Sequence, residues 1–115
     1  MPIEKQPTPG RLKRRSDFLR VAGTGKKWVS PNVIVQTDQG SGEGVRFGLT
    51  ATKKLGNAVM RNRIRRRMRA AAKIALAGVA NVDVVLIGRV ATATCPFAQL
   101  VKDLTWCLKR LEITK

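Results

Sequence analysis

The segment from Lys53 to Lys73 constrains this chain most, because it is both highly charged and periodically apolar. It carries nine cationic side chains in twenty-one residues and no acidic side chain. On a helical wheel its apolar residues share one arc of about 80°, which predicts a helix packed against a core. They are Met60, Ile64, Met68, Ala71 and Ala75. A packed helix of this kind would hold its charges in a fixed geometry suited to a folded polyanion.

The polar positions of this helix fall into two groups. Those opposite the apolar arc are Asn62, Arg65, Arg66, Arg69 and Lys73. Those beside it are Arg61, Arg63 and Arg67. Their long stems can lie along the apolar surface while the charged ends reach solvent. The pattern predicts that the helix starts near Asn57 and that Gly78 caps its end.

Length and composition predict one domain that binds a polyanion. The chain has 115 residues, is 43% hydrophobic and has a formal net charge of +16, so a compact charged domain over residues 11–115 is expected. Nucleic acid is the favoured partner, with an anionic membrane surface as the competitor. No apolar stretch reaches the roughly 18 residues that span a bilayer. Residues 1–10 hold three prolines and no signal-like apolar run, which predicts a flexible N-terminal leader and a cytoplasmic protein.

The rest of the chain predicts two more helices and a small sheet. A first short helix would share the face of Leu12, Phe18, Leu19 and Ala22, with Ser16 or Asp17 at its N-cap and Gly23 and Gly25 at its end. Strands are expected over 27–37, broken at Pro31, then over 45–52 and 82–88, the last of them central. A loop would join the first two over 38–44.

The last helix is expected over 96–111. Its core-facing residues would be Phe97, Leu100, Val101, Leu104, Cys107, Leu108 and Leu111. Cys95 and Cys107 would lie in this helix about 18 Å apart, so they are expected to be reduced thiols.

The residue inventory leaves little for catalysis. There is no histidine or tyrosine, and the seven carboxylates are scattered along the sequence. A two-metal nuclease would need carboxylates clustered in space. By contrast, arginine outnumbers lysine six to one from Arg61 to Lys73, and acidic i,i+4 partners are lacking. Guanidinium groups suit bidentate phosphate contacts, so nucleic-acid binding is favoured over a merely solvated charged face.

One long run carries a specific resemblance. Residues 46–69, RFGLTATKKLGNAVMRNRIRRRMR, resemble the signature of the bacterial ribonuclease P protein subunit, with Arg61-Asn62-Arg63 matching its Arg-Asn-Arg motif. Arg11-Leu12-Lys13 with Asp17-Phe18 is similar to the family's first helix, and residues 84–89 to its last strand. The resemblance covers residues 11–111.

This resemblance implies a small α/β (α+β) sandwich of about four strands and three helices, in the order α-β-β(-β)-α-β-α. The Arg-Asn-Arg helix would form a left-handed crossover between parallel strands, against the usual hand. It also implies a protein subunit of an endoribonuclease whose catalytic subunit is RNA. The protein would assist binding of precursor tRNA and of Mg²⁺, held mainly by the RNA, while the RNA removes the 5′ leader. A protein monomer in a 1:1 complex is expected, without membrane or small-molecule substrate.

The resemblance also assigns residues, with none of them catalytic. The catalytic RNA would be bound by Lys53, Lys54, Asn57, Arg61, Asn62, Arg63, Arg65, Arg66, Arg67, Arg69 and Lys73. A cleft between the first helix and the sheet would hold the single-stranded leader through Arg11, Phe18, Arg46, Phe47 and Arg89. The two phenylalanines suit base stacking or the core equally well, and Arg89 suits a phosphate contact or an exposed strand end. No spacing is diagnostic of metal ligands, although Asn57 is a candidate.

The sequence differs from the family's pattern at two positions of the cleft, and two alternative functions are considered. Ala22 and Val35 stand where the family's cleft would accommodate a ring, which predicts weaker or more apolar leader contacts unless Trp28 substitutes. A ribosomal or nucleoid protein that coats polyanions would share the charge but need no catalytic RNA. An autonomous nuclease is disfavoured because histidine is lacking and no carboxylates are paired in sequence.

Overall fold

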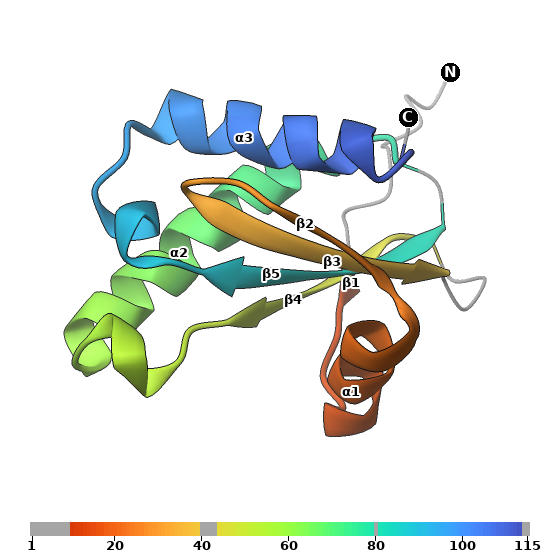
Figure 1. The fold of residues 1–115 in the computed structure, drawn as a ribbon, viewed down its shortest axis with the longest axis horizontal. Coiled ribbons are helices and arrows are strands. Elements are labelled where there is room, and N and C mark those ends of the chain that lie inside the picture. The colour runs from red at the N-terminus through yellow and green to blue at the C-terminus, as the bar shows by residue number, and fades with distance from the viewer. Residues whose placement is uncertain (1–9, 40–43, 80, 114–115) are drawn as a thin grey trace, which may run out of the picture.

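The computed structural model describes residues 10–39, 44–79 and 81–113, which hold one five-stranded sheet and three α-helices (Figure 1). The strands are β1 (Gly10–Arg11), β2 (Lys26–Val29), β3 (Val33–Gln39), β4 (Arg46–Thr50) and β5 (Val82–Gly88). The α-helices are α1 (Arg15–Thr24), α2 (Ala58–Ala75) and α3 (Phe97–Arg110). Two 3-10 helices, η1 (Lys53–Leu55) and η2 (Val90–Ala93), precede α2 and α3. None of these helices is long and apolar enough to cross a membrane.

The sheet has the order β1-β4-β5-β3-β2, so β5 is central as predicted. It pairs parallel to β4 and antiparallel to β3, and six of its seven residues are buried. This burial explains its nearly continuous apolar sequence. The expected strand over 27–37 is a hairpin of β2 and β3, because Pro31 interrupts pairing and Ser30 closes the turn by donating its backbone N–H to the Val33 carbonyl at 3.0 Å.

α2 connects the parallel strands β4 and β5, and this crossover is left-handed, as the resemblance implied (Figure 1). α2 and α3 pack on one face of the sheet, where Ile64, Met68, Leu100 and Leu104 are fully buried. α1 packs on the other face against Val85. The domain is therefore a sheet between one helix and a helix pair.

The structure confirms the predicted start of α2 and most of its core-facing residues. Asn57 caps it, since its Oδ1 accepts a hydrogen bond from the Met60 N–H at 3.0 Å. Four of the five predicted core residues are buried, but Met60 is 38% exposed, because it lies in the first turn against Gly56 rather than over the sheet. Gly78 is not the cap: Leu76 is, and Gly78 follows with φ 76°.

Both flanking helices depart from the prediction at their first turns. α1 begins at Arg15, so neither Ser16 nor Asp17 is its N-cap. Leu19 and Ala22 are exposed, and Val21 is buried in their place. The prediction was wrong because Leu12 precedes the helix and therefore does not share its phase.

α3 has the predicted apolar face, except at its beginning. Phe97, its first residue, is 40% exposed. Cys95 lies before the helix rather than in it, and both cysteines are free thiols. Burial raises the pKa of the Cys107 thiol.

Candidate nucleic-acid interface

The outer side of α2 is cationic and uncompensated. Asn62, Arg66 and Lys73 are exposed, as are Lys53 and Lys54 on η1 just before the helix. Among the described residues, the ion pairs are those of Arg20 and Arg46, and none involves a cation of α2. The helix therefore keeps its repulsive charge in the folded protein, as the sequence predicted.

Part of this surface forms a hollow of about 370 Å³ on the helix itself. Its lining is made of Val59, Asn62, Arg65, Arg66 and Arg69. Arg65 is held in place, because it donates to Asn62 Oδ1 at 3.2 Å and to the Ala51 carbonyl at 3.4 Å. Three arginines and one amide around a single hollow make a suitable setting for a phosphate group.

Two arginines beside the apolar arc are tied to the segment between β5 and α3. Arg63 Nε donates to the Ala93 carbonyl at 2.9 Å, and Arg67 Nη1 donates to the same oxygen at 3.0 Å. Arg67 Nη2 also donates to the Cys95 carbonyl. Their stems thus lie along the protein as predicted, and carbonyl contacts fix where the guanidinium groups lie. These contacts give both residues a structural role that sequence reasoning missed.

The five residues assigned to the leader cleft do not all lie on the α1 face of the sheet. Arg11 and Phe47 are paired across β1 and β4 on the α2 side, with the Arg11 guanidinium 5.3 Å from the Phe47 ring centroid. Phe47 is 1% exposed, so it belongs to the core and has no ring face open to a base. Of the two roles that the sequence allowed for Phe47, base stacking and core packing, the structure shows core packing. Val35 is likewise fully buried on that side.

Phe18 and Arg46 do lie on the α1 face. The half-buried Phe18 ring sits over Gly48, where an added Cβ would approach its Cε1 and Cζ to 2.5 Å. Arg89 is not a free strand-end cation, since its Nη1 donates to the Ser30 carbonyl at 2.8 Å. Ala22 is exposed on α1.

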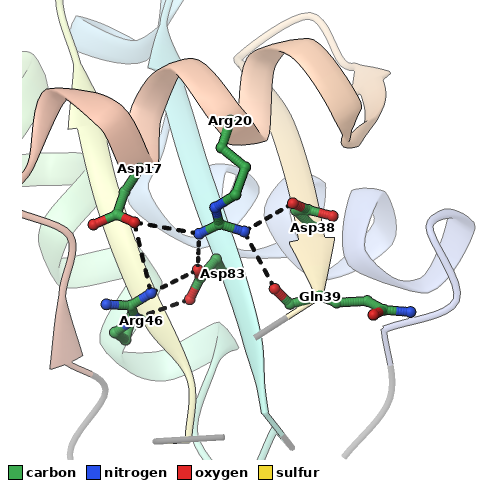
Figure 2. Close-up of polar contacts among 6 residues, drawn as sticks. All are labelled: Asp17, Arg20, Asp38, Gln39, Arg46 and Asp83. Carbon is green, nitrogen blue, oxygen red and sulfur yellow. Dashed lines mark hydrogen bonds and ion pairs between the residues drawn. The ribbon is translucent and has the colours of Figure 1, made fainter. Parts of the chain in front are cut away.

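Figure 2 shows an ion cluster beneath α1 that sequence reasoning missed. Asp83 is fully buried on β5, and its carboxylate accepts hydrogen bonds from Arg46 Nε at 3.0 Å and from Arg46 Nη2 at 2.8 Å. The two form a bidentate pair. Arg20 on α1 also donates to Asp83, and it donates to Asp38 at 2.8 Å. The hydrogen bond to Asp83 is the largest cause of the raised pKa of Arg20. Asp17 completes the cluster at 3.5 Å from Arg20.

Three of the seven carboxylates, although scattered along the sequence, are therefore close in space. Each of them contacts an arginine, and the described residues contain no group of three or more acids, cysteines or histidines placed to hold a metal ion. The signal in the sequence was Asp83 itself, an acid inside an apolar strand, because a buried charge requires a partner.

Comparisons with known proteins agree with this arrangement. The family profile described as Ribonuclease P matches residues 7–112. The chain is 45% identical to the ribonuclease P protein component of Paramagnetospirillum magneticum, over 88% of this chain and 81% of that protein. It is also 45% identical to that of Gluconacetobacter diazotrophicus, over 90% and 91%. A solved mutant of the Staphylococcus aureus RNase P protein superposes with a TM-score of 0.78 at 30% identity, covering 90% of this chain and 89% of that one. The chain belongs to the ribonuclease P protein family, and is a protein subunit of that endoribonuclease.

Proposed function

We propose that α2 and η1 bind the catalytic RNA of ribonuclease P, which then removes the 5′ leader of precursor tRNA. The observation that carries this proposal is the cationic face of α2, where carbonyl contacts hold Arg63, Arg65 and Arg67 and no cation pairs with an acid among the described residues. Guanidinium groups fixed before binding lose little side-chain entropy when they meet phosphates. An RNA backbone relieves their mutual repulsion at the same time.

The leader would pass over the α1 face, where Phe18 offers a half-buried ring. The buried Phe47 would not contact the leader, and Arg46 serves chiefly to neutralise Asp83. One protein monomer would bind one RNA in the cytoplasm, with Mg²⁺ held mainly through the RNA. The protein supplies positive charge near the bound substrate, and the chemistry belongs to the RNA.

The test is reconstitution with a bacterial ribonuclease P RNA at low Mg²⁺. The chain alone should cleave no precursor tRNA, and the mixture should restore leader removal. Arg65→Gln with Arg66→Gln should weaken assembly with the RNA about tenfold or more, since two charge-assisted contacts are lost. These two residues suit the test better than Arg63 and Arg67, whose carbonyl contacts also support the fold.

The matched control is Arg14→Gln with Arg15→Gln, an adjacent exposed pair at the start of α1. It removes the same charge from the opposite face of the sheet and should change RNA affinity much less. Equal losses in both variants would favour a general polyanion-coating protein instead. Cleavage by the protein without RNA would rule out the proposed division of labour.

A further inference from the structure

α3 lies over the β2 edge of the sheet (Figure 1). The only two tryptophans of the chain meet there, one from each element. Trp28 is on β2 and Trp106 is on α3, and their rings meet edge to face with centroids 5.6 Å apart. Trp106 is 44% exposed. An indole open to this extent has a surface available to a partner.

The same edge is cationic. The guanidinium carbon of Arg110 lies 5.5 Å from the Trp106 ring centroid and 5.8 Å from that of Trp28. Exposed lysines surround the rings: Lys102 and Lys109 are one helical turn from Trp106, and Lys26 shares the face of β2 with Trp28.

No described carboxylate neutralises this edge by an ion pair. Asp103, one helical turn before Trp106, is half-buried and accepts hydrogen bonds from Asn32 and Gln99. Glu112 lines a hollow together with Lys26, so four cations face two acids at this edge. The charge left over is positive, so it would repel a cationic surface and attract an anionic one.

We propose that this tryptophan–arginine patch is a second RNA contact that takes unpaired nucleotides. Its residues are Lys26, Trp28, Lys102, Trp106, Lys109 and Arg110. Unpaired bases stack on exposed rings and guanidinium planes, while neighbouring cations contact the phosphates. A double helix hides its base faces and cannot use the rings. The patch is made by β2 and α3 and contains no residue of α2, and the proposal does not depend on what α2 binds.

The chain carries its own probe for this test. Trp28 and Trp106 are its only tryptophans and tyrosine is absent, so its tryptophan emission reports only from the patch. Titration of the full chain with a single-stranded oligouridylate of about eight nucleotides should quench the emission, because a base stacks on the indole. An abasic oligomer of equal length has the same charge but no bases, and should leave the emission nearly unchanged.

Four variants locate the effect. Trp106→Ala and Arg110→Gln should each weaken oligouridylate binding about fivefold or more, with Trp28 as the remaining reporter in the first. Phe97→Ala removes a ring of similar exposure, 40%, from the other end of α3 and should behave as the wild type. Arg65→Gln with Arg66→Gln should keep the quenching at saturating oligouridylate, because neither residue belongs to the patch.

Equal quenching by the abasic oligomer would overturn the proposal, and so would unchanged emission once a labelled oligouridylate is bound. Loss of quenching in the α2 variant would assign the signal to α2 instead. A change in emission with protein concentration alone, abolished by Trp106→Ala, would identify the patch as a contact between protein copies. The reconstitution experiment does not bear on these outcomes, so either proposal can fail alone.

Discussion

Asp83 shows how one residue determines the position of an element. A carboxylate buried in the central strand needs positive partners, because an isolated charge in a protein interior costs several kcal/mol. Arg46 comes from the neighbouring strand and Arg20 from α1. The contact with Arg20 therefore fixes where α1 lies on the sheet, and with it the position of Phe18.

Replacing Asp83 with Asn should lower the free energy of unfolding by about 3 kcal/mol or more, since two arginines lose their shared counter-charge. Urea denaturation at neutral pH measures the loss. Asp38→Asn is the matched control, because the Asp38 side chain is 21% exposed and its removal should cost about 1 kcal/mol or less. If the two variants were equally stable, the cluster would not position α1 through Asp83.

The contact between α1 and the sheet depends on a glycine as well. Gly48 on β4 leaves room for the Phe18 ring, and a methyl group there would also meet Leu12 Cβ at 3.3 Å. α1 can therefore lie close to β4 because that strand lacks a side chain at this position.

Gly48→Ala should destabilise the protein by about 1–3 kcal/mol, since the Phe18 ring must move. Gly23→Ala is the opposite case: it lies inside α1 with nothing within 4 Å of the added Cβ, and should stabilise by about 0.5 kcal/mol. Thermal unfolding of the two variants should show shifts of opposite sign. A neutral Gly48→Ala would mean that Phe18 is loosely packed.

The sequence predicted elements with a long apolar rhythm well and short ones poorly. α2 and β5 were found near their true bounds because periodicity and burial agree over many residues. β1, with two residues, is too short to have a pattern of its own. The start of α1 was misplaced because Leu12 belongs to the core without belonging to the helix.

The parts of the candidate site that depend on local sequence were also predicted better than those that depend on tertiary contacts. The cationic positions of α2 could be read from the helical wheel, since they depend only on local geometry. The ion cluster could not, because Asp17, Asp38 and Asp83 are brought together by tertiary contacts alone. The role of Phe47 likewise depended on which face of the sheet it occupies.

At the scale of the whole molecule, the excess of positive charge governs association. The net charge of +16 is distributed over α2, the start of α1 and the β2 edge, while three of the acids are held beneath α1. Such a surface attracts RNA over a distance set by the ionic strength.

Affinity for ribonuclease P RNA should fall about a thousandfold or more between roughly 50 and 200 mM salt, as expected for six or more phosphate contacts. Arg65→Gln with Arg66→Gln should reduce the slope of log K against log salt by about 2. Filter binding over a salt series measures both quantities, with unfolding curves in the same buffers as the control. A slope near zero would contradict a phosphate-based interface.

The carbonyl contacts of Arg63 and Arg67 tie α2 to η2. If the backbone around Ala93 opened, both guanidinium groups would lose this shared acceptor, and Arg67 would keep only its contact with the Cys95 carbonyl. A ligand that favours the held orientation therefore also favours the closed form of η2, by the same free energy. If α2 binds RNA as proposed, a stretch of backbone that need not touch the RNA would share in the free energy of binding.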